Sequence, residues 1–344
     1  MMFHIRYRIA ALLALAAVLL TGCTDGDPRV AVHALSGQTM GTSYHIKVVA
    51  SEELDKANLQ QRIQAVLDRI EARMSTYRED SELSRFNRLQ GQDWFDVSDE
   101  TAAVVSLAQT ISDQTQGAFD ATVGPLVNLW GFGPDPRIHN APDSALIDER
   151  MQQIGYQAVQ VRQQPPSLSK QQSRSLDLSA IAKGYAVDQL AELLANEFDG
   201  FMVEVGGELR LHGNKPGDKP WRIAIERPDV GSRKLQQVIE VGDNAIATSG
   251  DYRNYFEQDG VRFSHTIDPK TGRPIRHRLA SVTVVDPSCA RADAFATAMM
   301  VLGDEKGLAL ATELGLNVFF IVKSDEGFVE KHTPGFERFI KSPN

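Results

Sequence analysis

Lys183 and Gly184 lie near the expected start of a helix, a position that is unfavourable for a cation, and glycine is unfavourable within a helix. Residues 175–178 alternate polar and apolar, and apolar residues further on recur at helical spacing, so a strand is expected to turn into a helix near Ser179. Ser179 is a suitable N-cap, but the helix macrodipole repels a cation in the first turn. Gly184 adds a cost of about 1 kcal/mol relative to alanine. An anion such as a diphosphate, paired with Lys183, would account for both residues; an exposed lysine on a tolerant helix is the alternative.

Asp293 and Thr297 form a second candidate group. A helix is expected to begin near Arg291, and its core stripe consists of Phe295, Ala298, Met299 and Leu302. Asp293 and Thr297 lie four residues apart, so they share a face that points away from this stripe. A carboxylate and a hydroxyl are hard oxygen ligands that suit magnesium, which usually completes its octahedron with phosphate oxygens. A solvated helix face with the same spacing is the alternative.

His265 lies in residues 261–267, which alternate as a strand does before a turn rich in Asp, Pro and Gly. This position suits a general base near neutral pH, while a hydrogen-bonded core histidine is the ordinary outcome. Tyr77 and Phe119 each follow a helix, where an aromatic ring can stack on a flat heterocycle or pack at the core or rim. The chain has no zinc-type Cys/His spacing, no nucleophile elbow of a serine hydrolase and no glycine-rich phosphate loop.

The order of elements predicts a mixed α/β fold, with α+β layers and strands in clusters rather than in regular βαβ alternation. Helices are expected around residues 63–74, 98–111, 187–198 and 291–314, the last interrupted at Gly303. Residues 163–173 are expected to form a hairpin or an excursion, and residues 317–322 the closing strand. One folded domain is predicted for residues 37–344.

Composition limits the classes of function. The 344 residues are 42% hydrophobic and 24% charged, which is ordinary for a globular protein with a substantial core. The formal net charge of −9, without a basic stripe, argues against nucleic-acid binding.

The N-terminus has the order of an export signal. Arg6 and Arg8 precede the apolar residues 9–20, a run too short to span a bilayer comfortably. The following Thr21-Gly22-Cys23 resembles the lipobox of bacterial lipoproteins, which implies a signal peptide of residues 1–22, acylation of Cys23 and a tether over residues 23–36. A plain signal peptide with an incidental cysteine is the alternative. If Cys23 is acylated, Cys289 is the only other thiol, and no intramolecular disulfide forms.

Eight segments together resemble the FAD:protein FMN transferase family, the ApbE-type flavin transferases. In chain order they are Met40–Thr42, Met74–Tyr77 with Ser81–Asn87, Phe119–Pro125, Asp177–Tyr185, Val203–Glu208, Ala247–Tyr252, Ser264–Pro269 and Asp293–Ala298. They extend from about residue 37 to residue 303. One fragment alone is weak, but eight in family order are specific.

The resemblance implies a fold and an activity: an ApbE-like fold that cleaves FAD, transfers FMN to a threonine hydroxyl of a partner protein and releases AMP. It places flavin contacts at Met40, Tyr77, Ala118, Phe119, Asp120, Asp177, Lys183 and Ile267. It places Mg2+ on the main-chain carbonyl of Ala180 with Asp293 and Thr297, and matches His265 to the residue that abstracts the hydroxyl proton. This agrees with phosphoryl-transfer chemistry, which depends on neutralising charge.

Two rival functions fit the same residues: an FAD pyrophosphatase that gives FMN and AMP, and a non-catalytic flavin-binding lipoprotein. The expected partners are FAD, an acceptor protein with a target threonine, such as a respiratory flavoprotein subunit, and a membrane reached through the lipid anchor. No nucleic acid is expected. The predicted location is the bacterial cell membrane on the periplasmic side, and Thr24 leaves the choice of inner or outer membrane open.

Overall fold

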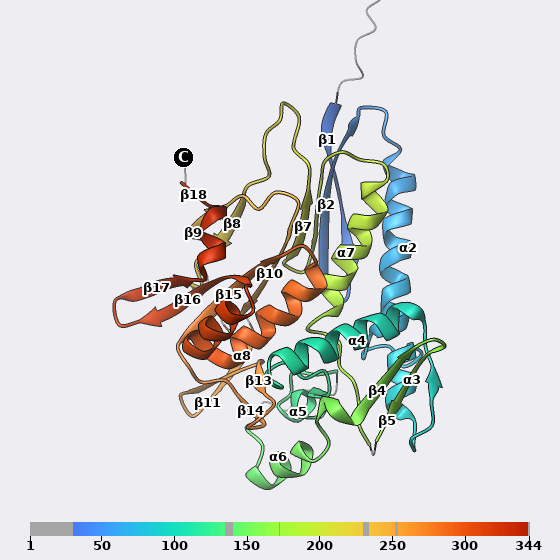
Figure 1. The fold of residues 1–344 in the computed structure, drawn as a ribbon, viewed down its shortest axis with the longest axis vertical. Helices are drawn as coiled ribbons and strands as arrows, with labels where there is room; N and C mark the ends of the chain where they lie inside the picture. The colour runs from blue at the N-terminus through green and yellow to red at the C-terminus, as the bar shows by residue number, and fades with distance from the viewer. Residues whose placement is uncertain (1–29, 135–139, 172, 230–233, 252–253, 343–344) are drawn as a thin grey trace, which may run out of the picture.

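An eight-stranded sheet forms the centre of the computed structural model, which describes residues 30–134, 140–171, 173–229, 234–251 and 254–342 (Figure 1). Its order is β1-β2-β6-β7-β10-β15-β16-β17, and every neighbouring pair is antiparallel. In that order the strands span Val30–Thr39, Thr42–Ser51, Phe201–Val205, Glu208–His212, Ala245–Gly250, Leu279–Asp286, Asn317–Ser324 and Gly327–His332. The predicted mixed α/β fold with clustered strands is confirmed.

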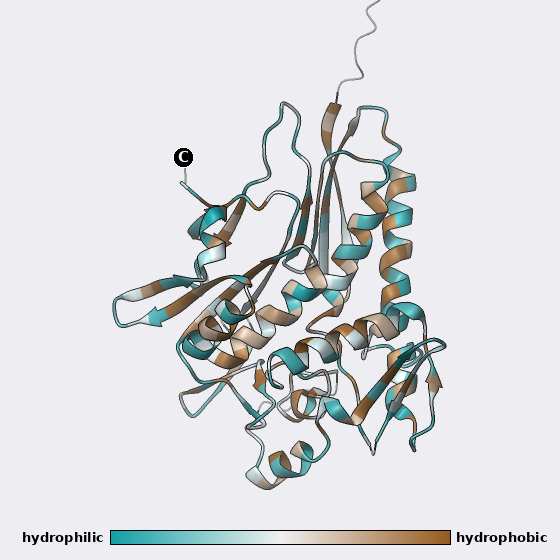
Figure 2. Cartoon of the chain, in the orientation of Figure 1, coloured by the Kyte–Doolittle hydropathy of each residue, from teal (hydrophilic) through white to brown (hydrophobic). Residues whose placement is uncertain are grey.

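Helices cover one face of this sheet. They include α2 (Lys56–Met74), α7 (Ala182–Ala195) and α8 (Cys289–Glu313). Successive strand residues point to opposite faces, so Ala245 and Ala247 of β10 pack under the helices while Ile246 faces the other way. Figure 2 shows apolar residues along α8 and along the strands beneath it, where the largest core cluster lies.

A smaller layer covers part of the opposite face. It consists of β8 (Ile223–Glu226), β9 (Leu235–Ile239) and β18 (Ile340–Lys341) in the order β18-β9-β8, with the 3-10 helix η2 (Pro334–Phe339). Trp221, Phe319 and Phe336 belong to the core between this layer and the main sheet. In the part of the chain that the structure describes, β8 is therefore an edge strand of its sheet.

The remaining elements surround the helix side. A three-stranded sheet in the order β3-β5-β4 lies beside α3 and α4, and the other elements gather around Leu126, Trp130 and Phe263 (Figure 1). The bounds are α3 (Glu82–Arg88), β3 (Phe95–Asp96), α4 (Asp99–Gln114), α5 (Gly124–Leu129), α6 (Ser144–Met151), η1 (Tyr156–Ala158), β4 (Val159–Gln163), β5 (Pro166–Lys170), β11 (Tyr255–Gln258), β12 (Val261–Ser264), β13 (Ile267–Asp268) and β14 (Arg273–Pro274). The hairpin expected near residues 163–173 is formed by β4 and β5.

Three predicted boundaries are wrong. The tether predicted for residues 23–36 overlaps β1, which begins at Val30 and pairs with β2 along its whole length. Residues 175–178 form no strand, because the side-chain amide of Asn87, rather than a ladder partner, bonds both the N–H and the C=O of Leu176, each at 2.8 Å. The strand predicted as the last, β16, is followed by β17 and β18.

Two other expectations concern the ends of elements and the export segment. The interruption predicted at Gly303 is confirmed, since α8 kinks there with φ 79°. The predicted signal peptide and Cys23 lie outside the described residues. Among the residues that are described, none of the helices combines the length and hydrophobicity needed to traverse a bilayer.

Candidate active site

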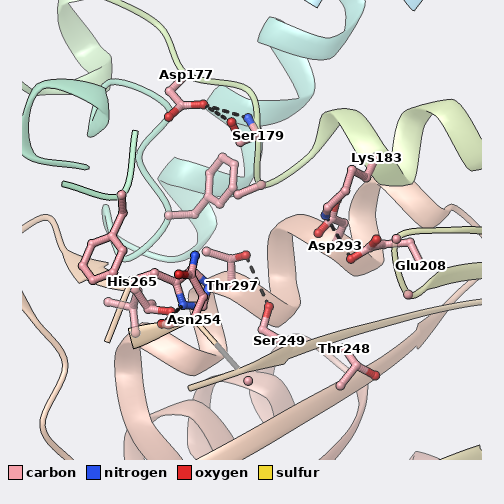
Figure 3. Close-up of a pocket in the computed structure, with 18 of the residues that line it drawn as sticks. Asp177, Ser179, Lys183, Glu208, Thr248, Ser249, Asn254, His265, Asp293 and Thr297 are labelled. Carbon is pink, nitrogen blue, oxygen red and sulfur yellow. Dashed lines mark hydrogen bonds and ion pairs between the residues drawn. The ribbon is translucent and has the colours of Figure 1, made fainter. Parts of the chain in front are cut away.

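A cavity of about 640 Å³ lies at the N-terminal ends of α7 and α8. Figure 3 shows Lys183, Glu208 and Asp293 grouped on one side of it and His265 on the other, with Thr297 between them. The predicted site residues that line the cavity are Tyr77, Ala118, Phe119, Asp120, Asp177, Ala180, Lys183, His265, Ile267, Asp293 and Thr297. The fold thus brings together residues spread over more than half of the chain.

Met40 is the exception among the predicted contacts. It does not line the cavity that the described residues form, but occupies the tight turn between β1 and β2 with φ 48°. Its N–H donates to Oε1 of Glu71 at 2.6 Å. The turn still lies near the site, because a Cβ on Gly206 would meet both Thr42 of β2 and Lys183.

Each of the helices α7 and α8 places a carboxylate at the N-terminal end of the other. Asp293 of α8 accepts from the N–H of Gly184 at 3.1 Å, and Asp188 of α7 accepts from the N–H groups of Cys289 and Ala290 at 2.9 and 3.0 Å. Each helix therefore supplies an acceptor for first-turn N–H groups of the other, which have no partner within their own helix. A carboxylate at a helix N-terminus is also favoured by the macrodipole.

Gly184 has a packing role, which the sequence did not indicate. A Cβ on this residue would lie 2.3 Å from the carbonyl oxygen of Cys289, so only glycine allows the two helices to approach this closely. The cost of glycine in a helix is thus linked to the crossing of α7 and α8.

Replacing Gly184 by alanine is expected to destabilise the fold. The added methyl group meets backbone rather than a flexible side chain, and such overpacking costs about 1–3 kcal/mol. Chemical denaturation should show the loss, whereas Glu192→Ala, on the exposed side of the same helix, should change the free energy of unfolding by less than about 0.5 kcal/mol. Equal stability of Gly184→Ala and the wild type would refute the packing role.

The start of α7 differs from the prediction. Ser179 is not its N-cap; the helix begins at Ala182, and the capping residue Ile181 makes no side-chain hydrogen bond. Ser179 instead donates its N–H to Oδ1 of Asp177 at 2.9 Å, and its hydroxyl bonds the same oxygen. Asp177 is held in turn by its N–H, which donates to the carbonyl of Ala121 at 2.7 Å. This local turn competes with helix capping, as short polar side chains often do.

Lys183 lies in the first turn of α7, as predicted, but its observed partners are two carboxylates. Its Nζ is 3.0 Å from Oε1 of Glu208 and 3.5 Å from Oδ2 of Asp293. Burial opposes the charged ammonium, yet the charges of Asp293 and Glu208 prevail and raise the pKa of Lys183. Burial also raises the pKa of Glu208, with Asp293 adding to the effect and Lys183 opposing it.

The oxygen atoms beside Lys183 fit a divalent cation. When its three side chains are ionised, the Lys183–Glu208–Asp293 group carries one excess negative charge, and the buried Oε2 of Glu208 has no hydrogen-bond partner. The hydroxyl of Thr297 and the segment of Ala180 line the same cavity. In the described part of the chain no three His, Cys, Asp or Glu side chains form a metal cluster.

His265 is prepared to act as a base. Its Nδ1 lies 3.0 Å from the main-chain oxygen of Asn254, which can only accept, so Nδ1 carries the proton and Nε2 is the basic nitrogen of the neutral ring. Burial lowers the pKa of His265, and the charge of Lys183 adds to the effect, although the Asn254 contact and Asp251 oppose it. The imidazole is therefore neutral near pH 7.

The two aromatic candidates take different positions. Tyr77 is 68% exposed at the rim of the cavity, where its ring can stack on a ligand, whereas Phe119 is 3% exposed and packs in the main core. Asp120 braces the adjoining loop: its Oδ1 accepts from the N–H and hydroxyl of Thr122 at 2.7 and 2.6 Å, and its Oδ2 from the N–H of Tyr156 at 3.2 Å. Burial raises the pKa of Asp120 despite these bonds.

Two contributors received no role from the sequence. Glu208 follows a glycine pair at the start of β7, and this position beside Gly206 and Gly207 was the available signal. Asn254 acts through its main-chain oxygen, which no side-chain pattern reveals.

Comparison with known proteins defines the class of this fold and site. A model of the ApbE family matches residues 40–320, and the chain belongs to this family. It is 49% identical over 333 residues to the FAD:protein FMN transferase of Vibrio cholerae, covering 96% of this chain and 98% of that protein. It is 40% identical over 348 residues to the FAD:protein FMN transferase of Escherichia coli K12, covering 98% and 99%.

Solved structures show the same fold. The flavin transferase ApbE from Vibrio cholerae superimposes with a TM-score of 0.84 and 47% identity, covering 90% of this chain and 100% of that one. The apo form of the flavinyl transferase ApbE from Pseudomonas stutzeri gives a TM-score of 0.84 and 41% identity, covering 92% and 98%.

Proposed function

We propose that this chain transfers the FMN part of FAD to a threonine hydroxyl of an acceptor protein and releases AMP. The observation that carries the proposal is the single cavity in which the Lys183–Glu208–Asp293 group and His265 lie on opposite sides. The relatives named FAD:protein FMN transferase, which match nearly the whole chain, support both the substrate and the reaction.

The bonds formed and broken in the transfer define the role of each residue in the cavity. The threonine oxygen forms a bond to the phosphorus of the FMN part, and the bond from that phosphorus to the bridging oxygen of the diphosphate breaks. The bridging oxygen leaves with AMP, and the hydroxyl proton passes to Nε2 of His265 and then to solvent. Lys183 binds the diphosphate, and Tyr77 stacks on one of the two ring systems.

The same proposal includes a magnesium ion. Asp293, Thr297 and the carbonyl of Ala180 would hold it, and the bound ion supplies charge neutralisation for the diphosphate and its leaving group. The support is the excess negative charge that the Lys183–Glu208–Asp293 group carries when Glu208 is ionised, together with the unpaired buried oxygen of Glu208.

The mass of an acceptor protein tests the transfer. The chain, FAD and Mg2+ should add the mass of FMN less one water to a recombinant acceptor domain that is known to carry phosphoester-linked FMN on threonine. The same domain with its target threonine changed to alanine is the control and should gain nothing. An unmodified wild-type acceptor would contradict the proposal, and FMN and AMP formed equally fast without acceptor would favour a pyrophosphatase instead.

We further propose that acylated Cys23 anchors the chain to the bacterial membrane on its periplasmic side, where respiratory flavoprotein subunits are the acceptors. The order of residues before Cys23 supports this. Cys23→Ser should move the protein from the membrane fraction to the soluble fraction, because it removes the acylated thiol. A Thr24→Ser variant is the matched control and should stay with the membrane. Equal membrane association of Cys23→Ser and the wild type would exclude this anchor.

A further inference from the structure

The main sheet opens between β7 and β10. These strands pair only at Ala245 with Arg210 and at Ile246 with Leu209, although continuation of the register would place Ala247 opposite Glu208. β10 follows β15 over its whole length, from Ala245 to Gly250, and β7 likewise follows β6. The strands therefore diverge at the end of the sheet that carries Glu208.

The cavity continues through this opening to the opposite face of the sheet. Its helix-side half contains Lys183, His265, Asp293 and Thr297; its far-side half is lined by Leu209, Ile223–Glu226, Ile246, Thr248 and Thr283. Leu209 and Ile246 belong to the core on the far side, which places this half beyond the sheet. Figure 3 shows Ser249 directed toward Thr297 while the preceding Thr248 points to the other side of β10.

The two halves suit two different substrates. The residues assigned to FAD that line the cavity, among them Tyr77, Asp177 and Lys183, lie on the helix side of the main sheet. In phosphoryl transfer the attacking and leaving oxygens lie roughly in line with phosphorus, so the nucleophile must approach from the side opposite to AMP. The far-side half is the part of the cavity that FAD leaves available for this approach.

The far-side half has room for a polypeptide backbone. Ala224 at the middle of the edge strand β8 is exposed, as is Thr248, and the site where a Cβ of Gly207 would lie has no atom within 4 Å. A threonine side chain is short, so the acceptor backbone itself must enter the cavity. Edge strands bind extended segments through main-chain hydrogen bonds, and alternate side chains of such a segment point in opposite directions.

We propose that an extended segment of the acceptor protein binds beside β8 in the far-side half of the cavity and passes its threonine through the opening between β7 and β10. The proposal rests on the proposed transferase function. The site would take a strand-like polypeptide that carries the threonine.

Bulky substitutions in the far-side half test the proposal. With a recombinant acceptor domain that carries phosphoester-linked FMN on threonine, Ala224→Trp and Thr248→Trp in the full chain should each lower kcat/KM for the acceptor by about tenfold or more, mainly through KM. The affinity for FAD, measured by flavin fluorescence, should stay at the wild-type value. Leu235→Trp is the matched control, since Leu235 is 50% exposed on the neighbouring strand β9 and does not line the cavity.

A disulfide trap provides a test that no bulky side chain can confound. Ala224→Cys should crosslink to an acceptor domain with a cysteine two residues from its target threonine, and Leu235→Cys should not; Cys289 is buried and Cys23 is changed to serine in both chains. Unchanged acceptor kinetics in both tryptophan variants, or crosslinking at Leu235 rather than Ala224, would overturn the far-side route. Failure of the wild type to modify the acceptor would instead overturn the transferase function.

Discussion

His265→Ala is expected to slow FMN transfer by about 10²- to 10⁴-fold, the usual contribution of a general base. A threonine hydroxyl is a poor nucleophile at pH 7, and the neutral His265 places a basic Nε2 in the cavity. FAD binding should persist, because the charge cluster around Lys183 is untouched. The rate of mass gain of the acceptor measures the effect, and the exposed His45 gives the control variant His45→Ala.

The pH dependence separates a base from a structural histidine. Burial lowers the pKa of His265, so its neutral form persists to a lower pH than that of an ordinary histidine. Transfer by the wild type should therefore rise with pH, with the midpoint of the rise below about pH 6.5, the pKa of an ordinary histidine. A rate in His265→Ala equal to that of the wild type would remove this residue from the mechanism.

Asp293→Asn is expected to abolish Mg2+ binding and to reduce transfer by about 100-fold or more, because electrostatic stabilisation of phosphoryl transfer contributes several kcal/mol and each 1.36 kcal/mol is tenfold in rate. The amide oxygen of asparagine can still accept from the N–H of Gly184, so the crossing of α7 and α8 should be retained. Calorimetric titration with Mg2+ and the transfer assay measure the two losses independently.

Asp304→Asn is the matched control for this variant. Asp304 lies on the same helix beyond the kink, is paired with Lys331 at 2.6 Å and does not line the cavity. Its ion pair is partly exposed and lies outside the cavity, so Mg2+ binding and transfer should both remain at wild-type values. Normal Mg2+ affinity of Asp293→Asn would show that the metal is held elsewhere.

The sequence predicted which residues line the cavity better than it predicted the ion pairs that they form. Helical spacing placed Asp293 and Thr297 on one face, and both line the cavity. It could not reveal that Lys183 pairs with Glu208 and Asp293, because both partners lie on elements remote in sequence. A charge that looks unfavourable in its own helix was stabilised by tertiary contacts, which local propensity does not include.

Local turns limited the prediction of boundaries. Ser179 satisfied the sequence rule for an N-cap. In the structure its N–H and its hydroxyl both bond Oδ1 of Asp177, and the helix begins at Ala182. Residues 175–178 showed strand alternation, yet the amide of Asn87 replaced the ladder partner. In both cases a side chain of suitable reach satisfied the backbone, and only the folded chain shows which one does so.

The hydrogen bonds between the carboxylates of one helix and the N-terminal N–H groups of the other, in α7 and α8, have a consequence for biogenesis. Gly184 and Asp293 are 109 residues apart, and Asp188 and Cys289 are 101 apart, so these contacts cannot form until almost the whole chain has left the ribosome. A chain interrupted before residue 288 lacks α8 and keeps Lys183 without Asp293. Completion of the Lys183–Glu208–Asp293 group therefore depends on completion of synthesis as well as on correct folding.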